Sequence, residues 1–184
     1  MNGIFKSIWG AWCVMQFDRE ALTYFEPTMD AFFKSFRALI FALPLYLIAL
    51  HFQNMVSLRY SGESFPMGLA LVDYMIRWAT YLVFAYVFAR VLNIGHNFIG
   101  FAVVFNWVKV WLVIVPLPIL ALGAYGLLDD ATYGILSLVL FLYMVGVQIF
   151  TLYLALGATL IEASGIFLAV FLFDKLVQAG LTGV

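Results

Sequence analysis

The sequence predicts an all-α membrane protein, a compact bundle of five transmembrane helices preceded by a short amphipathic helix at the membrane interface. Two observations lead to this prediction. Of the 184 residues, 66% are hydrophobic and only 10% are charged, whereas roughly 25% of the residues in soluble proteins are charged. The apolar residues also gather in stretches of the roughly 20 residues that a helix needs to cross a bilayer. A soluble globular fold is therefore excluded.

Residues 1–27 are expected to form a cytoplasmic or interfacial segment. Apolar side chains recur there at helical spacing, at Ile4, Phe5, Ile8, Trp9, Trp12 and Met15. Trp9 and Trp12 suit the headgroup layer, where an indole ring is half solvated. The pattern predicts a helix over residues 3–16 that lies on the bilayer, on the base of the protein itself, or on both. Asp18 is expected to cap a second short turn that ends before Pro27.

Residues 28–184 are expected to form the transmembrane bundle, with Thr28 as the cap of its first helix. The predicted spans cover residues 36–56, 67–89, 98–124, 133–156 and 159–180. Pro44 predicts a bend in the first span, and Pro116 and Pro118 interrupt the third. The connections are short, and the one at Gly157 is very tight, so consecutive spans are expected to be antiparallel neighbours.

The distribution of Lys and Arg predicts the orientation of this bundle. One side carries Lys6, Arg19, Lys34, Arg37 and Arg90, whereas the opposite side carries only Arg59. We therefore expect the N-terminus in the cytoplasm and, with five spans, the C-terminus outside.

Four ionisable residues lie at membrane depth, namely Asp73, Arg77, Lys109 and Asp174. Charged residues are costly there and need either a partner or a function. Asp73 and Arg77 are four residues apart on one helical face and can pair. Lys109 would then pair with Asp174 across the bundle. In the alternative arrangement, the partners are exchanged. The cluster is therefore interpreted either as a structural network or as a proton or ion relay, and the sequence favours the structural network.

A second polar layer is expected nearer the cytoplasm, where Asn106 and Gln148 lie at comparable depth and can hydrogen-bond across helices. On the face of the fifth span opposite Asp174, Gly165 and Ala169 have the spacing of small residues that allows another helix to approach closely.

The sequence contains no pattern typical of catalysis, and we expect no enzyme, no cofactor and no metal site. HExxH, the P-loop and GxGxxG are all missing from it. His51 and His96 lie far apart in predicted loops on opposite sides, and the single cysteine, Cys13, excludes an intrachain disulfide. With 9 basic and 10 acidic residues, there is no polyelectrolyte face for nucleic acid.

Three short stretches stand out, namely Phe32-Phe33-Lys34-Ser35-Phe36-Arg37-Ala38-Leu39, Phe105-Asn106-Trp107 and Leu154-Ala155-Leu156-Gly157. A single aspartate also lies late in the fifth span, at Phe173-Asp174. These features resemble the Yip1-type membrane proteins, in particular small bacterial members. The resemblance implies five spans, a cytoplasmic N-terminus, and a role in membrane organisation or trafficking without any catalytic residue. It also favours a bacterial inner membrane as the location.

We therefore expect a non-enzymatic scaffold or accessory subunit that acts through contacts between helices and with the membrane surface. Its expected partners are membrane lipids and another membrane protein or a larger membrane complex. The alternative is a small transporter or channel in which Asp73, Arg77, Lys109 and Asp174 couple protons or ions.

Overall fold

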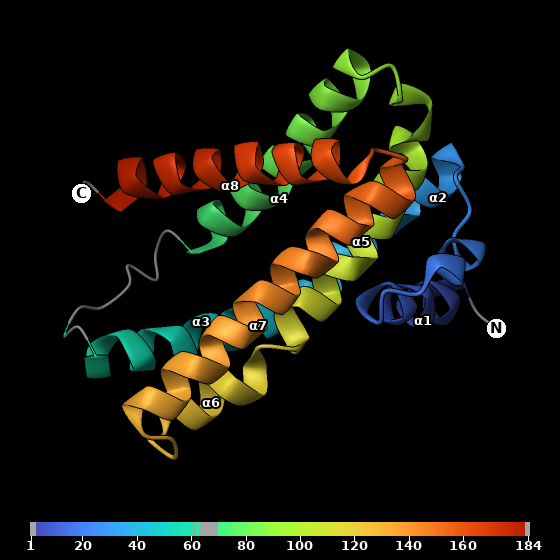
Figure 1. Cartoon of the computed structure of the whole chain (residues 1–184). Helices are drawn as coiled ribbons and strands as arrows, with labels where there is room; N and C mark the ends of the chain where they lie inside the picture. The colour runs from blue at the N-terminus through green and yellow to red at the C-terminus, as the bar shows by residue number, and fades with distance from the viewer. Residues whose placement is uncertain (1–2, 61, 63–69, 183–184) are drawn as a thin grey trace.

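A computed structural model describes residues 3–60, 62 and 70–182, and within these residues the chain is helical without a strand (Figure 1). The longer elements in chain order are α1 (Gly3–Met15), α2 (Met29–Ser35), α3 (Arg37–Tyr60), α4 (Ala70–Val91), α5 (Phe98–Ile114), α6 (Leu117–Ala124), α7 (Asp130–Thr151) and α8 (Leu160–Thr182). Two short 3₁₀ turns, η1 (Arg19–Tyr24) and η3 (Gly95–Asn97), precede α2 and α5, and a π-helical turn, η4 (Leu152–Leu156), follows α7.

The structure is compatible with the membrane character predicted from composition. Within the described part of the chain, three helical stretches are long and apolar enough to cross a bilayer, namely Met29–Tyr60, Gly95–Ala124 and Asp130–Leu156. They cover the first, third and fourth predicted spans. α4 and α8 lie where the second and fifth spans were expected, although residues 67–69 of the second are outside the described residues.

α5 is the central helix of the molecule. Every residue from Phe101 to Val108 is buried, because α5 packs against α1, α2, α3, α4 and α7. A helix that is apolar on all sides is expected to be enclosed by others, and the sequence of α5 has this character apart from Asn106 and Lys109. Because α5 is enclosed by other helices, its two polar side chains, Asn106 and Lys109, lie inside the molecule or at a cavity between helices.

α1 packs against the sides of α5 and α7. The indole N–H of Trp111 donates to the backbone carbonyl of Ile8 at 3.0 Å, and the Tyr143 hydroxyl donates to that of Met15 at 2.7 Å. Trp12 faces inward, with its ring centroid 4.7 Å from that of Trp111, whereas Trp9 is 51% exposed. The two tryptophans that were expected together at the interface therefore differ in burial. They are three residues apart, about 60° around the helix axis, and Trp12 is the one that reaches the Trp111 ring of α5.

The end of α1 is held by an unusual residue for its position. Phe17 has a φ of 60°, a left-handed conformation that usually requires glycine at the end of a helix. The backbone N–H groups of Phe17 and Asp18 donate to the carbonyls of Val14 and Cys13, and the Phe17 ring packs against Tyr143 and Phe150. The contact of this ring with α7 offsets the backbone cost and anchors the end of α1.

The helix caps predicted from the sequence are confirmed. The Thr28 hydroxyl accepts a hydrogen bond from the backbone N–H of Ala31 at 3.1 Å, and the Asp18 carboxylate accepts one from that of Glu20 at 2.8 Å. Asp129 caps α7 in the same way. The hydroxyl and the backbone N–H of Thr132 donate to the Asp129 carboxylate and hold its pKa below the ordinary value.

Two interruptions divide long apolar stretches. The predicted third span is split between α5 and α6 at Pro116 and Pro118, since proline lacks an N–H and clashes with the preceding turn. The predicted first helix is divided at Phe36 into α2 and α3, whereas α3 continues through Pro44.

The connection between α7 and α8 is as tight as the sequence predicts. Gly157 has a φ of 74° directly after η4, and this conformation is readily adopted by glycine. The Asn97 side chain donates to the backbone carbonyl of Leu156 at 3.0 Å. A Cβ atom at position 157 would lie 2.8 Å from the Asn97 amide nitrogen, so glycine is also required for this contact.

α8 and α4 form a pair that extends to one edge of the molecule (Figure 1). The two helices run in opposite directions and cross in this view, and Arg77 of α4 meets Asp174 of α8. The Phe84 and Phe173 rings meet between them, with centroids 4.9 Å apart.

Candidate functional site

A cavity of about 220 Å³ lies where α4, α5, α7 and α8 meet. Each of the four helices contributes at least one polar or charged side chain to its wall, and the polar lining consists of Arg77, Thr80, Tyr81, Lys109, Gln148 and Asp174. The remainder is formed by apolar and aromatic side chains of α7 and α8, such as Phe141 and Phe171. Three of the four residues predicted as the intramembrane network are therefore brought to one cavity.

An ion pair joins α4 directly to α8 at this cavity. The guanidinium of Arg77 donates to the carboxylate of Asp174 at 2.6 Å. The two side chains are 33% and 22% exposed, so both are partly withdrawn from the surroundings. A short charge-assisted bond of this kind is among the stronger hydrogen bonds in proteins, and here it links two helices that are far apart in the sequence.

Lys109 approaches the same cavity from α5, and aromatic rings surround its ammonium group. The Nζ atom lies 5.0 Å from the ring centroids of both Tyr81 and Phe105, within the range in which the face of a ring attracts a cation. The two rings are stacked on each other at 4.4 Å. Lys109 thus lines the same cavity as the Arg77–Asp174 pair. The ion pair that the carboxylate of Asp174 forms is with Arg77.

The arrangement decides between the two pairings that the sequence leaves open for Asp174. The structure shows Arg77, rather than Lys109, bonded to this carboxylate. The side chain of Asp73 lies outside the described residues, although its backbone belongs to α4. The predicted contact between Asp73 and Arg77 therefore stays a prediction.

Asn106 and Gln148, expected as one polar layer, have different surroundings. Gln148 lines the charged cavity, and its side-chain N–H lies 3.5 Å from the backbone carbonyl of Met144 on its own helix. Asn106 is fully buried, and both ends of its amide are bonded to other segments. The depth of the two residues is similar by sequence, but their directions around their helix axes differ.

Asn106 is the middle member of a buried hydrogen-bond chain that sequence reasoning missed. The Trp78 indole N–H donates to its side-chain oxygen at 2.8 Å, and its amide nitrogen donates to the Ser35 hydroxyl at 2.8 Å. Ser35 in turn donates to the backbone carbonyl of Phe32 at 2.7 Å. The chain joins α4, α5 and α2. A tryptophan in the middle of a predicted span was the available signal, because its N–H needs an acceptor in the bilayer.

The chemistry available at the cavity is electrostatic. The described residues provide two cations, one carboxylate and the uncharged donors of Thr80, Tyr81 and Gln148. Within the described part of the chain, no group of three His, Cys, Asp or Glu side chains could hold a metal ion. Such a site can hold helices together, or it can bind a small ion or a proton.

Comparison with protein-family models, curated proteins and solved structures finds no match to this chain. The resemblance of its motifs to Yip1-type membrane proteins therefore stays a prediction.

Proposed function

We propose that the chain is a five-span, non-enzymatic integral membrane protein that acts as a scaffold or accessory subunit. Three candidate spans support this proposal, and so does the length of the remaining two helices. α4 and α8 have 22 and 23 residues, which corresponds to about 33–35 Å at 1.5 Å per residue and is sufficient for the hydrocarbon core. The basic residues of the N-terminal segment favour a cytoplasmic N-terminus, and we propose the bacterial inner membrane as its location.

The proposed topology predicts the result of reporter fusions. We expect fusions within residues 93–97 to report the cytoplasm, together with fusions at the N-terminus. Fusions after Ser64 and after Val184 are expected to report the outside, because five spans place the ends on opposite sides. Paired reporters, one active on each side of the membrane, provide the control. A C-terminus on the same side as the N-terminus would contradict five spans.

The observation that best supports a scaffold is the outward face of α8. Its large apolar side chains are exposed along the helix, at Leu160, Ile161, Leu168, Leu172 and Leu176, with exposed fractions from 54% to 87%. On the same helix Gly165 is exposed, and a Cβ atom there would have nothing within 4 Å. Together with Ala169, it provides the small surface on which helices pack closely in membranes.

Replacing Gly165 with leucine is expected to disrupt association through α8 while the protein itself stays folded. The added side chain meets open space within the chain, but it would separate α8 from a partner helix. The measurement is site-specific cross-linking from α8 in native membranes, with identification of the cross-linked proteins after purification in mild detergent. We expect a specific product from the natural sequence and its loss in Gly165→Leu.

Gly134→Leu is the matched control, because Gly134 is also exposed on a long helix, α7, and its Cβ position is also open. This variant should keep both the melting temperature and the cross-linked product. Equal products from both variants would contradict a role of α8 in association.

A second candidate function is transport of protons or small ions, and the cavity beside Arg77, Lys109 and Asp174 is the observation that favours it. Charged residues that line an intramembrane cavity often belong to an ion or proton pathway. The break between α5 and α6 supplies only part of the discontinuity that is typical of transporter helices. Proton flux in proteoliposomes, recorded for variants of Arg77 and Asp174, separates the two functions.

A further inference from the structure

The backbone of α1 is bound at the middle of two candidate spans. Trp111 and Tyr143 donate the two hydrogen bonds that hold it. Trp111 lies close to the middle of Gly95–Ala124, which has 30 residues. Tyr143 lies midway along Asp130–Leu156, which has 27 residues. At 1.5 Å per residue these stretches are about 40–45 Å long, the thickness of a bilayer with its headgroups, so their middle corresponds to the hydrocarbon core.

The chain that follows α1 rises along α7 toward the proposed cytoplasmic side. The Phe17 ring packs against Phe150, with centroids 5.3 Å apart, and the guanidinium of Arg19 lies 5.9 Å from the centroid of Tyr153. Tyr153 is close to the end of its candidate span and lies about 15 Å beyond Tyr143 at 1.5 Å per residue. The charged start of η1 is therefore near headgroup depth, and α1 lies below it.

The two sides of α1 differ in chemistry. Gly10 faces η1, since a Cβ atom there would meet the side chain of Tyr24. The exposed side chains of α1 are Phe5, Trp9 and Gln16, and the two aromatic ones are 64% and 51% exposed. At about 100° per residue, Phe5 and Trp9 lie about 100–140° around the axis from Gly10. This aromatic face is thus turned away from the charged turn η1.

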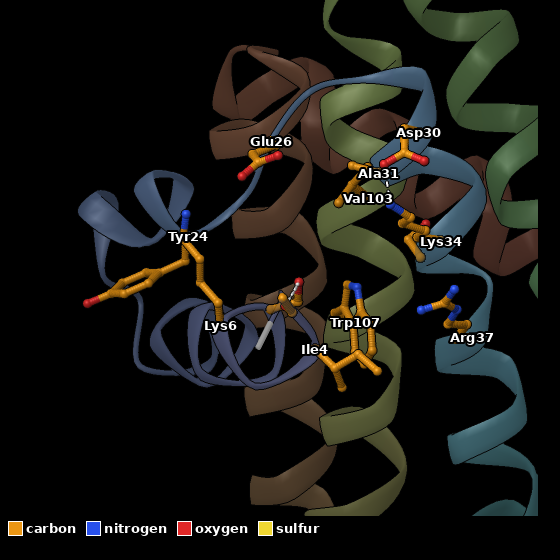
Figure 2. Close-up of a pocket in the computed structure, with 13 residues that line it drawn as sticks. Ile4, Lys6, Tyr24, Glu26, Asp30, Ala31, Lys34, Arg37, Val103 and Trp107 are labelled. Carbon is orange, nitrogen blue, oxygen red and sulfur yellow. Dashed lines mark hydrogen bonds and ion pairs between the residues drawn. The ribbon is translucent and has the colours of Figure 1, made fainter. Parts of the chain in front are cut away.

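Another side of α1 borders a cavity of about 490 Å³ between α1, α2 and α5 (Figure 2). Lys6 and Ser7 line it, together with charged side chains of other segments such as Glu26 and Lys34. Figure 2 shows the Lys6 side chain extending from α1 toward Tyr24 of η1. A long basic side chain can in this way carry its charge to a polar boundary while its stem covers apolar surface.

We propose that α1 is an intramembrane helix in the cytoplasmic leaflet, and that its face formed by Phe5 and Trp9 binds the acyl chains of the surrounding lipids. Its 13 residues extend about 20 Å, too short to cross a hydrocarbon core of about 30 Å. Polar groups at membrane depth are tolerated beside a water-filled cavity, and the cavity beside Lys6 supplies this surrounding. The inference rests on α5 and α7 as spans, as under Proposed function, but not on the scaffold role.

The test measures the depth of a nitroxide label on the full chain in phosphatidylcholine vesicles at a low ratio of protein to lipid. The single cysteine, Cys13, is first replaced with alanine. Collisions with oxygen, which concentrates in hydrocarbon, are compared with collisions with a water-soluble nickel chelate. Labels on Phe5→Cys and Trp9→Cys should collide mainly with oxygen. Both should lie at least about 10 Å deeper than a label on Glu20→Cys in η1, the diameter of one helix.

Leu142→Cys on α7 is the matched control, because Leu142 is 59% exposed and adjacent to Tyr143 in the middle of its candidate span. Its label should report hydrocarbon depth. Ser7→Cys tests the side of α1 that lines the cavity. It should react with a small water-soluble methanethiosulfonate, whereas Phe5→Cys should not. An unreactive Ser7→Cys would contradict the hydrated cavity.

Labels at Phe5 and Trp9 that collide mainly with the nickel chelate, beside a Leu142 label in hydrocarbon, would overturn the proposal while leaving the spans intact. Labels shielded from both oxygen and the chelate would also overturn it, because protein rather than lipid would then cover this face. A Leu142 label that collides mainly with the chelate would show that α7 is not a span, and would overturn both this inference and the proposed function.

Discussion

Neutralising either partner of the Arg77–Asp174 pair alone should lower the melting temperature of the protein in detergent. Asp174→Asn leaves the guanidinium of Arg77 without its carboxylate, and Arg77→Gln leaves the carboxylate without its cation. Breaking a buried pair costs about 3–5 kcal/mol in soluble proteins. Because the two side chains are 33% and 22% exposed, we expect each single variant to lose about 3 kcal/mol of stability, the lower end of this range. The double variant Arg77→Gln with Asp174→Asn should recover much of this stability.

The same variants separate the structural role from transport. Each is reconstituted into proteoliposomes, and proton flux is recorded beside the melting temperature. For a structural network, both single variants are unstable, the double variant is stable, and the natural protein shows no flux above empty vesicles. Normal stability in both single variants would contradict the structural role. Flux in the natural protein that is lost in a stable Asp174→Asn variant would establish the transporter instead.

Asn106→Leu is expected to destabilise the protein more than any other removal of an uncharged polar group in the described bundle. The substitution leaves the Trp78 indole N–H and the Ser35 hydroxyl without their partner in the buried chain. A buried polar group left unsatisfied costs about 1–3 kcal/mol, although interhelical hydrogen bonds in membranes average only about 0.6 kcal/mol. Two such groups are affected here, so we expect about 1–4 kcal/mol in total. The measurement is thermal unfolding in detergent.

Gln148→Leu is the control for this prediction, because the sequence places Gln148 at the same depth as Asn106. Its side-chain N–H lies 3.5 Å from the Met144 carbonyl, at the outer limit of a hydrogen bond, so little stability should be lost. A second measurement follows the fluorescence of the five tryptophans, in which the Trp78 contribution should shift in Asn106→Leu and stay unchanged in Gln148→Leu. Equal destabilisation by both variants would contradict the central position assigned to Asn106.

The helical, membrane-type architecture could be predicted from the sequence because its causes are local. Apolar stretches of sufficient length, the capping side chains of Thr28 and Asp18, and the pair Pro116 and Pro118 act on neighbouring residues in the chain. The structure accordingly places helices at the predicted stretches and divides the third at the two prolines. Of the predicted site, the gathering of Arg77, Lys109 and Asp174 at one cavity followed from the cost of charge in a bilayer.

The tertiary structure alone decided which partner each polar group has. Sequence spacing gives the depth of a residue along its helix, but a partner also depends on how the helices are rotated and which of them are neighbours. The contact between α4 and α8 brings Arg77 to Asp174. The rotation of α5 turns Asn106 away from Gln148 and toward Trp78. These contacts join residues from 28 to 97 positions apart, and such distant contacts leave no periodic pattern in the chain.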